Sequence, residues 1–153
     1  MFSEKVLGLS WKGDVDKAGG ICQKRVNVGS EAAPEMYNLN SLFITLRTNR
    51  TKRIPLRMGV LNLAHELLHS FGARHDSPEC REGQVLNYFQ SKIVSSVYQK
   101  SFRCRPTNTR RGGRYLMSKF SSSGVRTNNQ LISHCTAADV LKTLSTKVIT
   151  RIL

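Results

Sequence analysis

Acidic residues are scarce in this sequence. Its 153 residues include 10 Asp plus Glu against 24 Lys plus Arg, which gives a formal net charge of +14 at pH 7. Such an excess of positive charge favours polyanionic partners. However, the basic residues gather in two stretches, 47–57 and 100–119, whose Thr, Asn, Pro and Gly content is typical of solvated loops. No nucleic-acid-binding motif accompanies them, so we expect no specific nucleic acid as a partner and only a polyanion contact through the basic loops.

Long apolar runs are also absent. No stretch approaches the about 20 residues of a transmembrane helix. The first seven residues lack the basic and apolar regions of a secretory signal. Any export signal or membrane anchor is therefore expected to lie outside this sequence or not to exist. A hydrophobic fraction of 39% is sufficient for one globular domain with a modest core.

Cysteines are few, and none of them forms a C-x-x-C pair, which argues against a zinc ribbon and a thioredoxin-like redox site. An even number of widely spaced cysteines fits an oxidising compartment. Several disulfide arrangements remain open for Cys22, Cys80, Cys104 and Cys135.

The apolar pattern predicts two strands and two helices. The strands are expected at Val6–Trp11 and Ser41–Leu46. A long amphipathic helix is expected from about Met58 to Phe71, because its apolar residues recur at three- and four-residue spacing, and Gly72 is a natural stop. A final helix begins near Thr136, with an apolar face formed by Val140, Leu141, Leu144 and Val148.

The remaining segments are expected to be mostly irregular. Val85–Tyr98 is compatible with either helix or strand, and Trp11 is expected in the core or in a cleft wall. Loops are predicted where Gly, Ser, Asn or charged residues gather, at 14–25, 107–113, 121–124 and 127–129.

Three of the four histidines lie in one short segment, His65-Glu66-Leu67-Leu68-His69-Ser70-Phe71-Gly72-Ala73-Arg74-His75-Asp76. On a helix, His65 and His69 project from the same face, one turn apart, so both can reach one zinc ion. A glycine three residues later permits the left-handed turn that returns the chain and brings His75 in as a third ligand. Three imidazoles leave the fourth position open, which is typical of a catalytic zinc.

Glu66 directly follows the first ligand and is therefore poorly placed to bind the same ion. Its carboxylate is expected to act as the general base toward a water whose pKa the zinc has lowered. A lone H-E-x-x-H also occurs by chance in unrelated helices, but Gly72, His75 and Asp76 at fixed offsets argue against chance here. The other histidine, His134, is expected to be an ordinary loop residue beside Cys135.

The extended motif H-E-x-x-H-x-x-G-x-x-H-D is the metzincin signature, and its terminal aspartate resembles the reprolysin/ADAM family. Further segments resemble the Kuzbanian-type, α-secretase branch of that family. They are Leu7-Gly8-Leu9-Ser10-Trp11, Gly19-Gly20-Ile21-Cys22, Asp76-Ser77-Pro78-Glu79-Cys80, Arg114-Tyr115-Leu116-Met117 and Ser133-His134-Cys135.

The resemblance implies an α/β (α+β) metzincin-like fold, with a partial twisted sheet over the active-site helix, an irregular lower subdomain and a C-terminal helix. Met117 would form the Met-turn beneath the zinc, although a methionine there is also compatible with plain core. Gly8 and Leu9 would lie on the edge strand that binds extended substrate. A Cys80–Cys135 disulfide would brace the lower subdomain.

The family further implies one Zn²⁺ ion and zinc-dependent hydrolysis of internal peptide bonds. Its protein substrates are membrane-protein ectodomains, Notch and amyloid precursor protein among them. The implied location is the extracellular face of the cell membrane or the secretory pathway.

Several features depart from the family pattern. The chain starts at what resembles the fourth strand, so the preceding N-terminal strands have no counterpart, and residues 1–153 correspond to a partial catalytic domain. A basic insertion covers about 85–112, and within it Cys104 is a candidate partner for Cys22, whose usual partner cysteine in the family has no counterpart here. Much of the apolar face of the active-site helix is expected to stay uncovered. The alternative function is therefore a catalytically impaired fragment or paralogue that retains zinc and acts by binding. A basic nucleic-acid-binding module ranks last.

Overall fold

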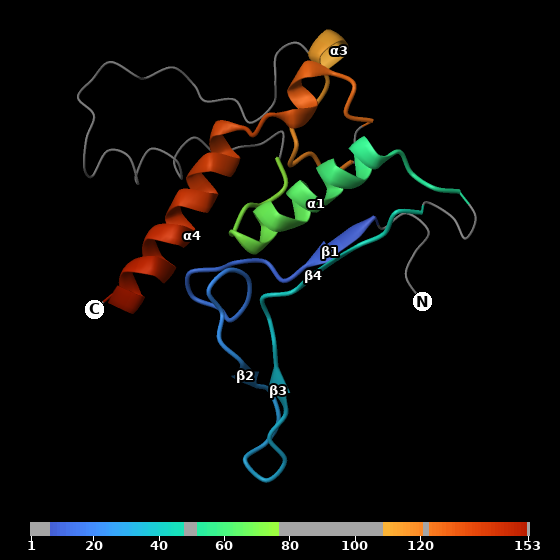
Figure 1. Ribbon diagram of the computed structural model, residues 1–153. Helices are drawn as coiled ribbons and strands as arrows, with labels where there is room; N and C mark the ends of the chain where they lie inside the picture. Colours follow the sequence, from blue (N-terminus) through green and yellow to red (C-terminus); the bar gives the residue numbers. More distant parts are fainter. Residues whose placement is uncertain (1–6, 48–51, 77–108, 121–122, 153) are drawn as a thin grey trace, which may run out of the picture.

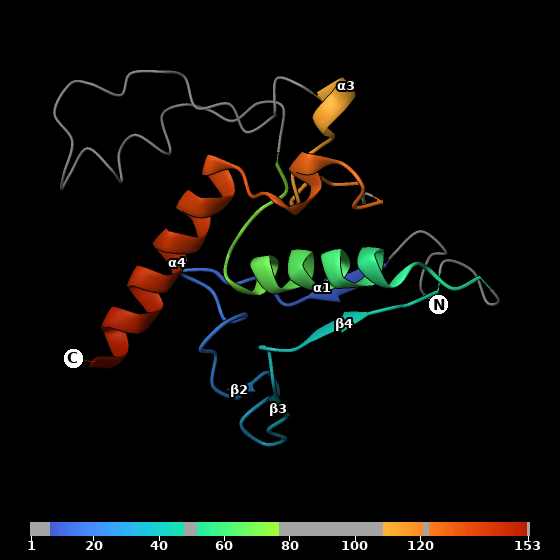
Figure 2. The ribbon, with the colours of Figure 1, turned by 45° about the horizontal axis from the view of Figure 1, so that its top comes forward.

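The computed structural model describes residues 7–47, 52–76, 109–120 and 123–152. It combines helices with two small sheets around a central helix, α1 (Leu56–Ser70) (Figure 1). Turning the molecule shows α1 between a strand ladder on one side and the segment that contains α3 (Thr109–Gly112) on the other (Figure 2). This arrangement agrees with the expected mixture of helices and a small sheet.

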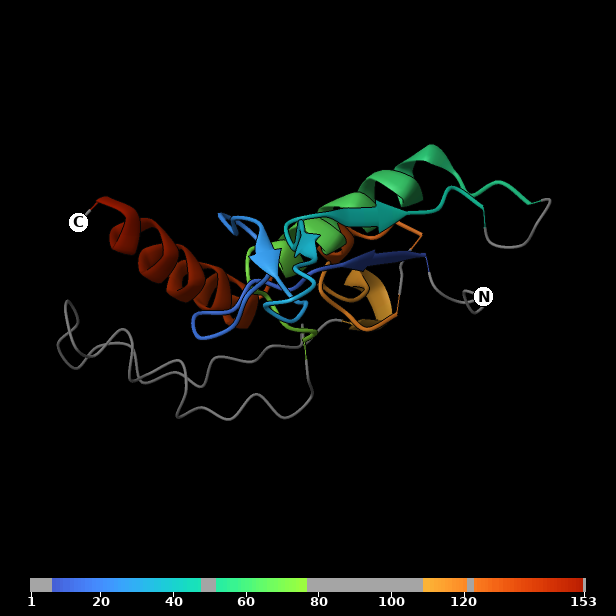
Figure 3. The same cartoon turned by 90° about the horizontal axis from the view of Figure 1, so that it is seen from below.

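The ladder consists of β1 (Gly8–Ser10) and β4 (Leu42–Ile44), which pair antiparallel with Leu9 opposite Phe43. Both strands fall within the ranges predicted from the sequence. Because side chains alternate along a strand, Gly8 and Ser10 face α1, whereas Leu9 and Phe43 share the opposite face and are 47% and 53% exposed. Seen from below, β1 and β4 run alongside α1 (Figure 3).

Helix α1 begins directly after Pro55 and ends where glycine was predicted to stop it. The amide of Ala73 donates to the carbonyl of Leu68, and the amide of Gly72 donates to that of His69. These two bonds form a Schellman motif, with Gly72 at φ 99° in the left-handed region. The predicted helix end is therefore confirmed.

Part of the surface of α1 is buried, and an apolar stripe along the helix is not. Leu61, Glu66 and Ser70 are among the buried residues. Four apolar side chains at helical spacing remain exposed, namely Leu56 (77%), Val60 (55%), Leu63 (37%) and Leu67 (41%). We call these four residues the outer stripe of α1. The expectation that this apolar face stays largely uncovered is confirmed.

Four elements were not predicted from the sequence. A short hairpin joins β2 (Val26–Asn27) to β3 (Met36–Tyr37). The expected loops at 107–113 and 127–129 were wrong in part, because they contain α3 and a 3-10 helix, η1 (Thr127–Gln130). Side-chain amides hold these turns together: Asn128 donates to the carbonyl of Gly113, and Asn129 donates to that of Arg114.

The C-terminal helix, α4, spans His134–Ile152 and thus starts two residues before the predicted position. Its predicted apolar face was wrong in part: Leu141 is 47% exposed, whereas Thr136 (1%) and Thr143 (4%) are buried. These threonines are buried because their side of α4 lies against the segment that follows α1. The Trp11 side chain is 50% exposed and so does not lie in the core. Its alternative place in a cleft wall stays a prediction.

Within the described residues, no helix combines the length and the apolar character that a membrane span requires. Val85–Tyr98, Cys80, Cys104 and nearly all of the predicted insertion lie outside the described residues. Cys135 is disulfide-bonded. Its pairing with Cys80 remains a prediction.

Candidate metal centre

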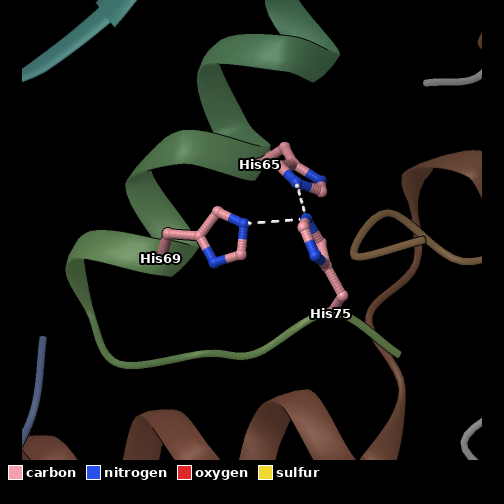
Figure 4. A group of neighbouring side chains, drawn as sticks. All are labelled: His65, His69 and His75. Atoms are coloured by element: carbon pink, nitrogen blue, oxygen red, sulfur yellow. Dashed lines mark hydrogen bonds between the residues drawn. The ribbon is translucent and has the colours of Figure 1, made fainter. Parts of the chain in front are cut away.

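The motif histidines converge on one point. His65 and His69 project from α1, and His75 reaches them from the loop that follows (Figure 4). The Nε2 atom of His75 lies 3.1 Å from Nε2 of His65 and 3.1 Å from Nε2 of His69. One ligand atom from each of the three residues lies within 4.8 Å of the others. The structure thus brings together the three residues that the spacing had singled out.

Backbone carbonyls set the ring orientation of the two helical histidines. Nδ1 of His65 lies 2.8 Å from the carbonyl oxygen of Leu116, and Nδ1 of His69 lies 2.7 Å from that of Ala73. Because a carbonyl oxygen only accepts, each Nδ1 must carry the proton, and each Nε2 lone pair is left toward the centre. Metal-binding histidines are commonly oriented in this way by a second hydrogen bond.

The donor set fits a zinc ion. Zinc bound to histidine nitrogens at about 2.0–2.1 Å in tetrahedral geometry separates those nitrogens by about 3.3 Å, close to the two distances of 3.1 Å found here. Imidazole binds metal in its neutral form. Burial lowers the pKa of His69. Burial, together with His69, His65 and Lys119, lowers the pKa of His75 to about 4, so both rings are neutral at pH 7.

Glu66 is a residue of α1 and is 7% exposed. Its side chain lies against strand β1. The Ser10 hydroxyl donates to its Oε2 at 2.8 Å. Gly8 lies so near that a Cβ at this position would be 2.6 Å from both Cγ and Oε1 of Glu66. Glu66 also interacts electrostatically with His69. Strand β1 therefore fixes the carboxylate beside the histidine cluster.

The loop that carries His75 is held by residues far along the chain. The Asp76 amide donates to the carbonyl of Met117 at 2.8 Å, and the Asp76 carboxylate accepts hydrogen bonds from Ser133 and Thr136. Burial raises the pKa of Asp76. The Met117 side chain is fully buried. His134 is exposed at the start of α4 and takes no part in the histidine cluster.

Several residues that build this centre were not predicted from the sequence. Ser10 contacts Glu66, which is 56 residues away in the sequence. The carbonyl of Leu116 contacts His65, which is 51 residues away. Arg74 and Asp139 form an ion pair at 2.9 Å across 65 residues. No local pattern marks such pairs, although the segment Leu7–Trp11 had already been assigned to the edge strand.

Comparison with known proteins agrees with this geometry. A family model described as Metallo-peptidase family M12B Reprolysin-like matches residues 1–146. The chain is 30% identical over 148 residues to "Disintegrin and metalloproteinase domain-containing protein 10" of Homo sapiens, which covers 95% of this chain and 17% of the relative.

Two relatives from Caenorhabditis elegans are also similar. The homolog of the same protein is 32% identical over 145 residues, covering 91% of this chain and 13% of the relative. The "Disintegrin and metalloproteinase domain-containing protein 17 homolog" is 29% identical over 132 residues, covering 84% of this chain and 17% of the relative. The chain thus spans less than a fifth of the length of these relatives.

Proposed function

Since this chain belongs to the reprolysin-like M12B metallopeptidases, we propose that it is a zinc endopeptidase in which His65, His69 and His75 bind one catalytic Zn²⁺ ion. The convergence of the three Nε2 atoms is the observation that carries this proposal. The family is zinc-dependent, and three imidazole nitrogens are donors that such an ion binds.

Bound at this centre, zinc would polarise the scissile carbonyl and lower the pKa of a water molecule. The protein's own residues would do the rest. Glu66, held by Ser10, takes the proton of the attacking water and later delivers it to the leaving amine. The second edge of β1 has no strand partner within the described part of the chain. Gly8 and Leu9 therefore offer backbone groups to an extended substrate, and Met117 lies in the Met-turn beneath the centre.

The test of this function is metal content together with hydrolysis of an internally quenched peptide. We expect one zinc per chain, and we expect His75→Ala to weaken zinc binding by about 10³-fold because one of the three protein ligands is lost. His134→Ala is the matched control, since this exposed histidine is outside the cluster. Protein that binds no zinc when zinc is supplied in excess would contradict the proposal.

The contacts of Glu66 lead to a second prediction. Gly8→Ala places a Cβ within 2.6 Å of Glu66 and should lower kcat by about 100-fold, because a misplaced catalytic group loses its alignment. Ser10→Ala removes one hydrogen bond to the carboxylate and should lower kcat by about 10-fold. Zinc content should be unchanged in both. Ser145→Ala, far along α4, serves as the control, and wild-type kcat in Gly8→Ala would refute the assigned contact.

The substrates we propose are protein chains, specifically membrane-protein ectodomains such as Notch-type receptors. The location we propose is the extracellular face of the cell membrane or the secretory pathway. Support comes from the relatedness to disintegrin and metalloproteinase domain-containing proteins. The alternative is an impaired paralogue that retains zinc and acts by binding. Bound zinc combined with no hydrolysis of any peptide in a library would favour that alternative.

We also propose polyanion contact through the basic loops. Between Thr109 and Ala138 the sequence contains no acidic residue. Arg126 donates to the carbonyl of Arg110 at 2.6 Å, which gathers basic side chains of α3 and the η1 region. Arg111→Glu should reduce the slope of log affinity for heparin against log salt by about 1 in magnitude. Arg25→Glu, on the β2–β3 side of the molecule, is the control, and equal slopes for both variants would exclude these loops.

A further inference from the structure

His75 differs from the other two ligands in how it is held. His65 and His69 are fixed by α1 and by carbonyl oxygens that accept from Nδ1. Among the described residues, only His65 and His69 lie within hydrogen-bonding distance of the His75 ring. The position of this ring must therefore depend on the backbone of its loop.

The residue before His75 is held on α4 by three hydrogen bonds. Arg74 donates to the carboxylate of Asp139 from its backbone amide at 3.1 Å, from Nε at 3.0 Å and from Nη2 at 2.9 Å. The side chain of Asp139 is 20% exposed and that of Arg74 is 57% exposed. A fork of this kind fixes direction as well as distance. Asp139 thus holds both the side chain and the main chain of Arg74.

The neighbouring contacts show that one face of α4 is the support of this loop. Thr136, Asp139 and Thr143 are separated by three and four residues and lie on one side of the helix. Thr136 donates to Asp76, and Thr143 lies against Gly72, where a Cβ would be 2.0 Å from its Oγ1. Each end of the loop and its centre therefore contact the same face.

We propose that Asp139, acting through Arg74, is a positioning residue for His75 and thereby sets the zinc affinity of the centre. The proposal rests on the zinc site proposed above. Neither Arg74 nor Asp139 contacts a ring nitrogen of the three histidines. Their effect on His75 therefore passes through the backbone of the loop that carries it. Loss of the ion pair would leave His75 chemically intact but less well aligned.

The test is zinc affinity, measured by competition with a chromogenic chelator, in wild type, Arg74→Ala, Asp139→Ala and the double variant. Each single variant should bind zinc about 10-fold more weakly, as changes in outer-shell partners do. The double variant should lose little more, because both substitutions remove one shared interaction. The visible spectrum of the Co²⁺-loaded protein should change in the same variants, which a purely structural role would not cause.

Further variants keep the test independent of folding. Arg74→Lys retains the charge but not the fork and should give an intermediate affinity, even if Asp139→Ala does not fold. Lys142→Ala, exposed on the same helix, should bind zinc as wild type does. Zinc affinity and Co²⁺ spectra unchanged in folded Arg74 variants would overturn the positioning role alone. A wild-type protein without zinc would overturn both this role and the proposed function.

Discussion

Replacement of Glu66 by glutamine is expected to abolish measurable peptide hydrolysis, a loss of about 10³-fold or more, while zinc stays bound. The substitution retains the size of the side chain and can still accept the hydrogen bond from Ser10. It removes only the group that accepts a proton. Turnover of an internally quenched peptide and zinc content, measured on the same sample, separate the two effects.

Glu31→Gln is the matched control for this variant, since Glu31 is exposed on the β2–β3 side of the molecule. Its activity should equal that of wild type. Substantial hydrolysis by Glu66→Gln would remove Glu66 from the role of general base. Loss of zinc along with activity would instead indicate that Glu66 supports the histidine cluster.

The second large effect concerns stability. Gly72→Ala is expected to lower the free energy of unfolding by about 3 kcal/mol or more, because two penalties combine. Residue 72 has φ 99°, which side chains rarely adopt. In addition, the new Cβ would lie 2.0 Å from Oγ1 and 2.7 Å from Cβ of Thr143. Urea unfolding monitored by circular dichroism measures the loss.

Combining Gly72→Ala with Thr143→Ala tests the origin of that loss. The double variant should recover part of the stability, because removing Oγ1 relieves one contact but leaves the backbone strain. Full recovery would mean that φ is not strained in the variant. An unfolding midpoint equal to that of wild type in Gly72→Ala would contradict the described helix end.

The histidine centre was predictable because its information is local. His65 and His69 need only a helix, and the apolar period predicted one. Gly72 predicted the turn that returns His75. Family membership and the relationship to disintegrin and metalloproteinase domain-containing proteins were likewise recognised from motifs and are confirmed.

Other parts of the fold were not predictable because their information is distant. Strands of two residues, such as β2 and β3, are too short to show an alternating pattern. The buried face of α4 is polar because Thr143 packs on Gly72 and Asp139 binds Arg74. Apolar residues at helical spacing therefore identified this face only in part: Val140 and Leu144 are half-buried, whereas Leu141 is exposed.

The outer stripe of α1 has a consequence for the behaviour of the chain in solution. Four large apolar side chains, 37% to 77% exposed, follow one another along a single helix. Exposed apolar side chains on one face of a helix favour association between molecules. Self-association should therefore increase with protein concentration and with sulfate, which strengthens the burial of apolar surface. The high net positive charge opposes it most at low ionic strength, so the chain should be most soluble in dilute salt.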